Sequence, residues 1–257
     1  MHGRIQPSDS LVNRRSGRQS SGRRTELITL TERRNKMGVI NIAIDGPSGA
    51  GKSTIAKRLA KLLKVTYVDT GAMYRALGLK AVRLGIDPAD GEAVAPILKD
   101  TKIFFKNIDG EQHIFLDGED VSGLIRTEQI SNAASVISTH ASVREKLVDL
   151  QREIARNTDT VMDGRDIGTV VLPNTPYKFY VTASPEVRAR RRYLEYEQKG
   201  MLGNITYEQV LEEIKARDYR DMNREHAPLR PAERAKIIDT SEMDIDEAVD
   251  ALLEEID

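Results

Sequence analysis

Short apolar segments alternate with amphipathic segments along most of the chain. Residues 39–45 are rich in β-branched side chains, which is typical of a buried strand in a parallel sheet. Residues 54–63 then place Ile55, Leu59 and Leu62 on one face of a helix. Four later segments have the same strand character: 65–69, 160–163, 177–181 and 236–239. This alternation predicts an α/β fold with a doubly wound, parallel, five-stranded sheet whose ligands bind at the carboxyl ends of the strands.

Helices are predicted between and after these strands. Thr70 is the expected N-cap of a helix that follows the second strand, and Ser184 with Pro185 begins a helix after the fourth strand. The remaining helical segments are expected at about 92–99, 131–157, 207–223 and 245–255.

Residues 101–127 have a different pattern. Apolar and polar residues alternate there, and the pairs Asp109-Gly110 and Asp117-Gly118 separate the alternating runs. Asp-Gly between such runs is a strong signal for a β-hairpin turn. The segment therefore predicts a small antiparallel β insertion in the α/β domain.

The segment between the first strand and the first helix matches the phosphate-binding pattern G-x-x-x-x-G-K-[ST] in full. Its residues are Gly46, Pro47, Ser48, Gly49, Ala50, Gly51, Lys52 and Ser53, with Thr54 next in the helix. The glycines allow backbone N–H groups to curve around an anion, and the helix N-terminus adds partial positive charge at the same place. Lys52 is expected to contact the outer phosphates of a nucleotide and Ser53 to ligate Mg²⁺. A glycine-rich turn is the alternative, but the flanking strand and helix favour a P-loop NTPase fold.

The composition excludes several kinds of site. The 257 residues include no Cys, so disulfides, thiolate metal ligands and Cys nucleophiles are absent, and the four His residues are scattered. No apolar run approaches the roughly 18 residues that span a bilayer, and the N-terminus has no secretory signal pattern. We expect a cytoplasmic protein with no membrane partner.

Charge is distributed unevenly along the chain. Residues 1–37 contain nine Lys or Arg and three Asp or Glu (+6), so the other residues contain 30 and 37 (−7). Because nucleic-acid-binding domains are normally basic, no nucleic-acid partner is expected for the domain at 37–257. Residues 1–36 are predicted to be a disordered basic leader. We interpret the leader as an upstream stretch included by an early start, because Met37 directly precedes the first strand. A nucleic-acid-binding arm and a transit peptide are the alternatives.

Arginines are concentrated late in the chain. The range 186–224 contains two predicted helices with seven arginines, separated by Gly200 and Gly203, and it is expected to form a helical lid. Arg191 and Arg192 are predicted to contact phosphates, and Arg188 and Arg190 are predicted to be surface charges. A solvated charged face is the alternative for the whole range.

Polar residues at strand ends complete the predicted site. Asp163 ends the third strand, where a carboxylate could hold Mg²⁺ through its water shell, although a strand-end Asp can also simply cap a turn. Arg75, Arg165 and Asp166 follow strand ends and would converge at the same edge of the sheet, which suits a small acceptor with one phosphate and a base edge. Three residues of the second lid helix share one face and would add to this pocket: Arg217, Asp221 and Arg224.

Seven motifs resemble those of a known family. They are Asp45-Gly-Pro-Ser-Gly-Ala-Gly-Lys-Ser53, Asp69-Thr-Gly-Ala-Met-Tyr-Arg75, Gly118-Glu-Asp-Val-Ser-Gly-Leu-Ile-Arg126, Asn132-Ala-Ala-Ser135, Asp163-Gly-Arg-Asp-Ile-Gly-Thr-Val-Val171, Glu213-Ile-Lys-Ala-Arg-Asp218 and Ala227-Pro-Leu229. Together they resemble bacterial cytidylate kinases from about residue 38 to the C-terminus. The family resemblance implies a nucleoside monophosphate kinase fold, in which a core carries a monophosphate-binding region and a lid. It does not account for the leader.

The resemblance also implies roles for individual residues. The cytosine edge would be read by Ser135, Arg144 and Asp166. The acceptor ribose would be held by Arg217 and Asp221. The acceptor phosphate would be surrounded by Arg75, Arg165 and Arg224, with Thr70 nearby where many relatives have Ser. Charge in the transition state would be neutralised by Lys52, Arg165, Arg191, Arg192 and Arg224.

The implied reaction is in-line attack by a phosphate oxygen of CMP or dCMP on the γ-phosphate of ATP, with Mg²⁺ as cofactor. The acceptor is already an anion, so no general base is required. The resemblance also suggests a monomer. Two alternatives stay open: a P-loop kinase that acts on UMP or on a shikimate-like acceptor, and an RNA-associated nucleotide-binding protein that uses the leader as its arm.

Overall fold

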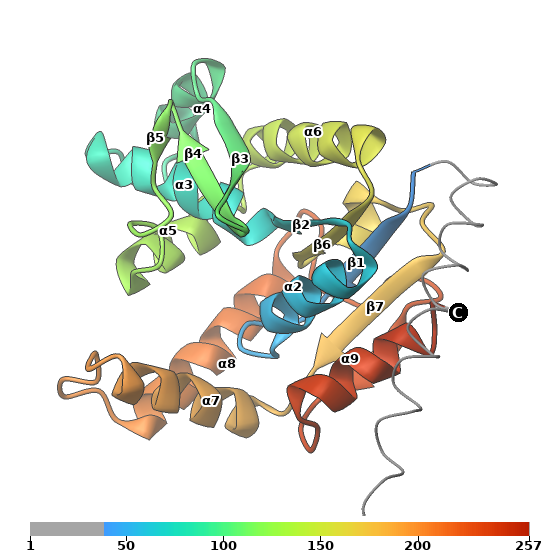
Figure 1. Ribbon diagram of the computed structural model, residues 1–257. Coiled ribbons are helices and arrows are strands. Elements are labelled where there is room, and N and C mark those ends of the chain that lie inside the picture. Colours follow the sequence, from blue (N-terminus) through green and yellow to red (C-terminus); the bar gives the residue numbers. More distant parts are fainter. Residues whose placement is uncertain (1–38, 257) are drawn as a thin grey trace, which may run out of the picture. The chain divides into compact units, whose positions relative to one another are not determined.

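Five parallel strands form the central sheet, in the spatial order β2-β6-β1-β7-β8 (Figure 1). Their bounds are Asn41–Asp45 for β1, Thr66–Asp69 for β2, Thr160–Gly164 for β6, Tyr177–Thr182 for β7 and Lys236–Asp239 for β8. This computed structural model describes residues 39–256, and the predicted leader lies outside them. The predicted parallel, five-stranded sheet is confirmed, and every one of its strands overlaps a predicted segment.

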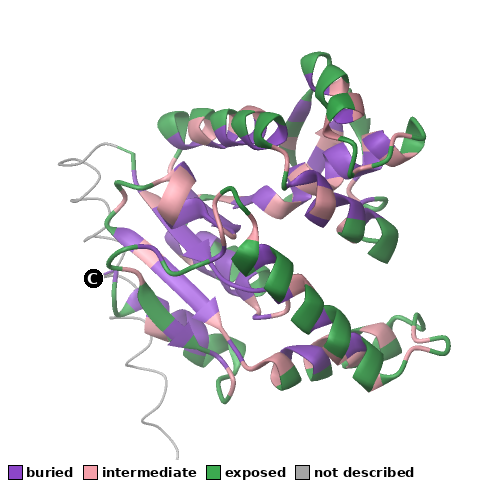
Figure 2. Ribbon diagram, turned by 180° about the vertical axis from the view of Figure 1, so that it is seen from behind, coloured by how far each residue is buried: buried purple, intermediate pink, exposed green. Residues whose placement is uncertain are grey.

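Helices cover both faces of the sheet, as expected for a doubly wound fold. Helices α2 (Lys52–Leu63) and α9 (Ile245–Leu253) contact each other on one face. On the other face, α6 (Ala141–Asn157) and the π-helical turn η1 (Ile167–Val171) pack on β1, β2 and β6 through a buried cluster: Ala43, Val68, Val148, Ala155, Met162, Ile167 and Val171. Figure 2 shows the inner strands mostly buried between these layers; β1, β6 and β7 are the most buried, whereas the edge strand β8 is largely exposed.

The predicted antiparallel insertion is confirmed as a three-stranded sheet. Its strands are β3 (Ile103–Ile108), β4 (Glu111–Leu116) and β5 (Glu119–Asp120). Both turns contain Asp-Gly pairs with positive φ, from 51° to 95°, as the sequence predicts for tight hairpins. The inner face of this sheet shares a core with α3 (Thr70–Arg83), α4 (Gly91–Lys99) and α5 (Glu128–Ile137).

Two helices form the hairpin that the sequence predicts as a lid. Helix α7 (Pro185–Gln198) begins at Ser184, whose hydroxyl accepts the N–H of Val187, and α8 (Tyr207–Asn223) begins in a capping box at Thr206. Small apolar residues and tyrosines pack between the two helices, including Ala189 and Val210. The hairpin and the β insertion lie on either side of the carboxyl ends of the strands (Figure 1).

Two local predictions are wrong. The helical stretch 131–157 is broken into α5 and α6, because the hydroxyls of Ser138 and Thr139 donate to the carbonyls of Ser135 and Val136 and end the first helix. The N-cap of α3 is Asp69 rather than Thr70, since the Asp69 carboxylate accepts the N–H of Ala72.

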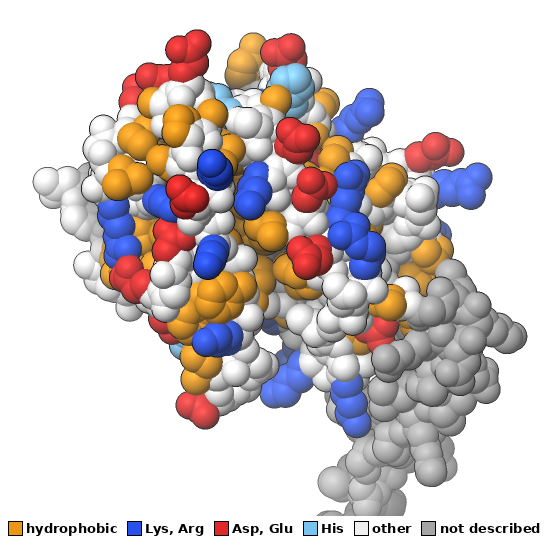
Figure 3. Space-filling view, turned by 90° about the horizontal axis from the view of Figure 1, so that it is seen from above, with side chains coloured by type: hydrophobic (Ala, Val, Ile, Leu, Met, Phe, Trp, Pro, Cys, Tyr) orange, Lys and Arg blue, Asp and Glu red, His pale blue; other side chains and the backbone are white. Residues whose placement is uncertain are grey.

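The molecular surface mixes both signs of charge on the face seen from above. In Figure 3, Lys and Arg side chains alternate with Asp and Glu side chains and with hydrophobic ones over this face. In the described part of the chain, no helix is both long and apolar enough to cross a membrane.

Gln112 connects the insertion to the edge of the central sheet. Its side-chain amide donates to the carbonyl of Tyr67 and accepts the N–H of Asp69 at 3.4 Å. These two backbone groups lie on one edge of β2, so the amide occupies the place that a residue of a parallel neighbouring strand would take. Gln112 thereby holds the end of β2, from which Asp69 starts α3.

Gln112→Ala is therefore expected to speed amide hydrogen exchange at Asp69 by at least about tenfold, because that N–H lies on the edge of β2 that pairs with no other strand of the described sheet and would lose its acceptor. Exchange measured by NMR tests this expectation. Glu111→Ala, on the same strand, is the control and should leave the Asp69 amide unchanged. Equal exchange in wild type and Gln112→Ala would contradict the role given to this side chain.

Candidate active site

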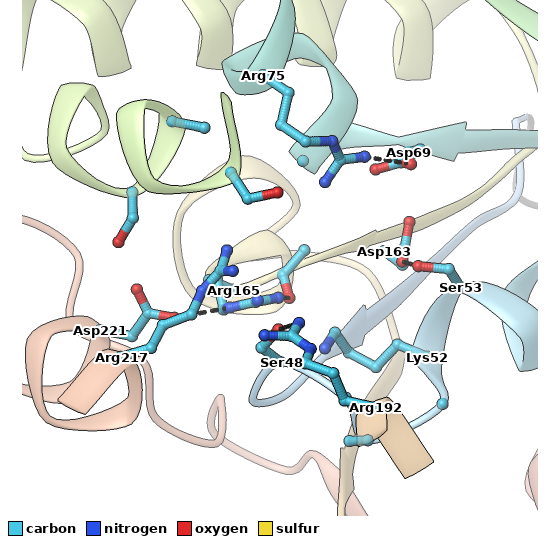
Figure 4. Close-up of a pocket in the computed structure, with 18 of the residues that line it drawn as sticks. Ser48, Lys52, Ser53, Asp69, Arg75, Asp163, Arg165, Arg192, Arg217 and Asp221 are labelled. Atoms are coloured by element: carbon cyan, nitrogen blue, oxygen red, sulfur yellow. Dashed lines mark hydrogen bonds and ion pairs between the residues drawn. The ribbon is translucent and has the colours of Figure 1, made fainter. Parts of the chain in front are cut away.

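A pocket of about 1140 Å³ opens at the carboxyl ends of the strands (Figure 4). Its walls come from the P-loop, the start of α3, helix α5, the residues after β6 and the hairpin α7–α8. Single-ligand pockets usually have volumes of roughly 300–1,000 Å³. The volume and the many walls of this pocket therefore suit two ligands side by side.

The P-loop forms the floor of one half of this pocket. Residues Ser48 to Thr54 line it, whereas Gly46 and Pro47 are not among the lining residues. Gly46 has φ of 143°, and a Cβ there would come within 1.9 Å of the carbonyl oxygen of Val181. Gly51 has φ of 87° and is the N-cap of α2. Only glycine suits these two positions, and the turn they allow directs backbone N–H groups at an anion.

Lys52 lies buried in the P-loop with its ammonium group facing the pocket. The Nζ donates to the carbonyl of Pro47 at 2.5 Å, and the residue is 5% exposed. Burial lowers its pKa, and the nearby Arg165 lowers it further, whereas Asp163 and Asp45 oppose the shift. Figure 4 shows Lys52 and Arg165 directed toward the same region. A bound polyphosphate would relieve this mutual repulsion of cations.

Asp163 and Ser53 meet at the edge of the P-loop. Ser53 Oγ donates to Asp163 Oδ2 at 2.6 Å, and the hydroxyl of Tyr67 donates to Oδ1 at 3.1 Å. Burial, reinforced by the charge of Asp69, raises the pKa of Asp163 to about 6. Among the described residues there is no cluster of three or more His, Cys, Asp or Glu that could hold a metal ion. Any cation here would therefore need ligand oxygens from a substrate in addition to these two residues.

The second half of the pocket begins at the start of α3. The Asp69 carboxylate pairs with Arg75 Nη2 at 2.8 Å, so the first turn of the helix fixes this arginine. Arg75 Nε is buried and has no hydrogen-bond partner. Thr70 Oγ1 donates to the carbonyl of Asp163 at 2.7 Å and ties α3 to β6. Arg75 and Thr70 both line the pocket.

Asp166 is the centre of a buried polar group in this half. Its carboxylate pairs with Arg144 from α6 and lies 3.7 Å from Arg224 Nη2, and Asp166 itself is only 5% exposed. Ser135 faces the same pocket, and its buried Oγ has no hydrogen-bond partner. A buried hydroxyl without a partner beside a fixed carboxylate and guanidinium suits recognition of a planar polar ligand.

Arg165, Arg217 and Asp221 form a third group between the two halves. Arg165 Nε donates to Asp221 Oδ2 at 2.9 Å. Arg217 lies next to them with Nε unpartnered, and burial together with the charge of Arg165 lowers its pKa to about 9. The helical spacing predicts Asp221 between Arg217 and Arg224 on one helix face, whereas its ion-pair partner is Arg165, which directly follows β6. An excess of positive charge at this point favours a bound phosphate.

The arginines of α7 differ from prediction in one respect. Arg192 Nη2 donates to Ser48 Oγ at 2.9 Å, and Arg191 Nη1 donates to Thr240 Oγ1 at 3.0 Å, so both face the P-loop side of the pocket. Arg190 is exposed, as predicted. Arg188 is not a surface charge: it is 3% exposed and makes a bidentate ion pair with Asp218.

Comparison with known proteins gives the family. The family model for cytidylate kinase matches residues 42–257. The chain belongs to the cytidylate kinase family. It is 52% identical over 218 residues to a cytidylate kinase of Caldicellulosiruptor bescii, an alignment that covers 85% of this chain and 96% of the relative. It is 52% identical over 217 residues, 84% of this chain and 94% of the relative, to a cytidylate kinase of Caldanaerobacter subterraneus subsp. tengcongensis.

A solved structure of shikimate kinase from Bacteroides thetaiotaomicron is similar at 16% identity with a TM-score of 0.44, over 84% of this chain and 97% of that chain. The two cytidylate kinases named above align with this chain over nearly their whole length, and they place it among the cytidylate kinases, which are ATP-dependent phosphotransferases.

Several pocket residues of this cytidylate kinase family member are absent from the sequence predictions. Tyr74 lines the same half of the pocket as Arg75, which follows it directly, and burial raises the pKa of Tyr74 to about 12. The half of the pocket that contains the P-loop extends past the loop along Thr240, Met243, Ile245 and Ala248. Thr240 is buried and donates to the carbonyl of Ala50 at 3.2 Å. It directly follows the last strand, and this strand-end position is the signal that could have found it.

Asp45 connects the end of β1, which precedes the P-loop, to the segment that follows Asp166. It ends β1, is 2% exposed, and accepts the N–H groups of Ile167 and Gly168 at 2.7 Å each. These residues directly follow Asp166. Burial raises the pKa of Asp45 to about 7, although the two hydrogen bonds oppose the shift.

Because folded Asp45 binds its proton more tightly than the unfolded chain, its contribution to the free energy of unfolding falls as pH rises from about 4 to about 7. Asp45→Asn cannot ionise, so the stability of wild type relative to this variant is expected to decrease across that range. Urea unfolding at several pH values measures the difference. A difference that stays constant with pH would contradict the raised pKa.

Proposed function

We propose that this chain transfers the γ-phosphoryl group of ATP to CMP and dCMP, giving ADP with CDP or dCDP. Besides membership of the family, one observation of the structure supports this proposal. A complete P-loop shares one pocket with a buried carboxylate, guanidinium and unpartnered hydroxyl, which are Asp166, Arg144 and Ser135. The donor and the acceptor would thus lie in the two halves of a single cavity.

ATP would bind in the P-loop half. The backbone of the loop and Lys52 would hold its phosphates, and Arg191 and Arg192 would approach them from α7. The base would lie along Met243, Ile245 and Ala248, which supply an apolar wall beyond the loop. ATP as the phosphate donor follows from membership of this kinase family.

The acceptor would bind in the other half. The amino group of cytosine is a donor that suits the Asp166 carboxylate and the free Ser135 hydroxyl, and the ring acceptors suit Arg144. Arg217 and Asp221 would hold the ribose. The acceptor phosphate would lie among Arg75, Arg165, Arg224 and Thr70.

The chemistry requires position and charge rather than a general base. The acceptor phosphate is an anion near neutral pH and can attack the γ-phosphorus directly. Arg165 stands between the two halves and Lys52 at the P-loop, so both would neutralise charge that spreads over the transferred oxygens. The hairpin α7–α8 would act as the lid that excludes water and prevents ATP hydrolysis.

The residues present fit a Mg²⁺ ion. The ion prefers a few hydroxyl and carboxylate ligands together with waters and substrate phosphates, and Ser53 with Asp163 offers that limited set. Ser53 would ligate the ion, and Asp163 would hold its water shell. A bound Mg²⁺ would offset negative charge on the ATP phosphates.

Asp163→Asn is therefore expected to raise the Mg²⁺ concentration that gives half-maximal activity by about tenfold or more, since loss of a side chain that holds a metal's ligands typically weakens metal binding by roughly 10–100-fold. Initial rates titrated with Mg²⁺ at saturating ATP measure this. The control is Asp159→Asn, four residues earlier at the opposite end of β6. An unchanged Mg²⁺ requirement would remove Asp163 from the metal site.

The proposed function is tested by ADP release with ATP and Mg²⁺ against CMP, dCMP, UMP, AMP, GMP and shikimate. Strong preference for CMP and dCMP supports it. Preference for UMP or shikimate would keep the P-loop kinase and reject the acceptor assignment. ATP binding without transfer to any acceptor would favour a nucleotide-binding role instead.

A further inference from the structure

Arg188 connects three parts of the molecule that are distant in sequence. Its guanidinium donates to the carbonyl of Ser48 at 3.1 Å and to the carbonyl of Ala183 at 2.8 Å. It also makes two hydrogen bonds to the Asp218 carboxylate, at 3.1 and 2.6 Å. Arg188 is 3% exposed and Asp218 is 8% exposed. The P-loop, the end of β7 and helix α8 therefore meet at one buried side chain.

The P-loop backbone also lies directly on Arg188. A Cβ at Gly49 would come within 3.2 Å of Arg188 Cβ, so a larger residue there would separate the loop from α7. The hydroxyl of Ser48 accepts from Arg192, one turn further along the same helix. The carbonyl and the hydroxyl of Ser48 thus both accept hydrogen bonds from arginines of α7, and the loop cannot shift without moving this helix.

Asp218 occupies a defined place on α8. It follows Arg217 directly and precedes Asp221 by three residues, so the same helical turn carries the ion pair and the proposed ribose ligands. Asp221 in turn pairs with Arg165. A displacement of Asp218 therefore moves the groups that face the acceptor.

We infer that the Arg188–Asp218 pair couples the donor half of the pocket to the acceptor half, so that binding of one nucleotide strengthens binding of the other. Arg188 and Asp218 are positioning residues in this inference, because neither of them lines the pocket. The inference rests on the proposed function, since it concerns the two substrates named there. The planar guanidinium of Arg188 has several N–H donors, so it can hold the Ser48 carbonyl and the Asp218 carboxylate in fixed relative positions.

The coupling is measured by equilibrium binding rather than by turnover. CMP is titrated into the full-length protein by calorimetry, with and without a saturating non-hydrolysable ATP analogue and Mg²⁺. In wild type, the analogue is expected to lower the Kd for CMP at least fivefold, within the usual range for coupled sites. By linkage, CMP must tighten the analogue by the same factor.

Two variants disrupt the pair in different ways. In Arg188→Lys, one ammonium group replaces the guanidinium and cannot hold the Ser48 carbonyl and the Asp218 carboxylate at the same time. Asp218→Asn keeps the shape of the side chain and one acceptor oxygen, so it preserves packing if the lysine variant fails to fold. In either folded variant the coupling factor is expected to fall below about twofold, whereas the analogue alone still binds within threefold of wild type. Arg83→Lys is the matched control, because Arg83 forms a similar fork with Glu119 on the exposed surface of the insertion.

The outcomes separate the two claims. Coupling in wild type and in Arg83→Lys that is lost in the pair variants supports the inference. If a folded Arg188→Lys or Asp218→Asn protein keeps the full coupling factor of wild type, the inference is overturned and the proposed function stays intact. The inference is also overturned, with the proposed function intact, if wild type binds both nucleotides but shows no coupling between them. Wild type that binds no CMP overturns the proposed function and the inference with it.

Discussion

Lys52→Met is expected to lower kcat for CMP phosphorylation by roughly 10²–10³-fold, the loss typical of removing one preorganised charge from a phosphoryl-transfer site. The methionine keeps an apolar stem of similar length in a position that is 5% exposed, so the loop should keep its packing. Steady-state kinetics with varied ATP and CMP measure the effect.

Lys61→Met is the control for this substitution, since Lys61 lies exposed on the same helix. Its activity should equal that of wild type. A Lys52→Met enzyme with a raised KM for ATP and an unchanged kcat would mean that Lys52 binds ATP equally in the ground state and the transition state.

Asp166→Asn is expected to lower kcat/KM for CMP by about 100-fold or more and to reduce the preference for CMP over UMP. Sites built to pair with a substrate N–H reject an analogue that lacks it, and this discrimination is lost when the acceptor is removed. The charged guanidinium of Arg144 would also lose its partner in a buried place, so stability must be measured in parallel. Kinetics with both nucleotides provide the test.

Ser135→Ala separates recognition from folding in the same pocket. The Ser135 hydroxyl has no protein partner, so its loss should leave the melting temperature unchanged while CMP use falls. Asp120→Asn, on the exposed strand β5, is the control for the carboxylate change. Unaltered discrimination between CMP and UMP in Asp166→Asn would reject the assignment of the base-reading pocket.

The P-loop and the insertion could be predicted because their signals are local. The spacing of Gly46, Gly51 and Lys52 reflects constraints within one turn, and the Asp-Gly pairs specify hairpins through their own backbone angles. The strands could be predicted because continuous burial in a parallel sheet requires apolar runs.

Features that depend on distant partners could not be predicted in this way. Arg188 looks like any arginine on a charged helix, and its burial depends on Ser48, 140 residues earlier, and on Asp218, 30 residues later. The ion pair of Asp221 with Arg165 likewise joins residues 56 positions apart. Gln112 has no periodic signal, since its role is set by the edge of β2. Tertiary contacts decided each of these cases.

The most direct test of the two-substrate pocket is a single turnover of γ-labelled ATP with excess enzyme and CMP, followed by separation of the nucleotides. Transfer within the pocket predicts that the label appears in the β-phosphate of CDP, with little inorganic phosphate formed. Label found only in inorganic phosphate would contradict the account, because the γ-phosphoryl group of ATP would then have been transferred to water rather than to CMP. Label retained in ATP would also contradict it, because no transfer would have taken place.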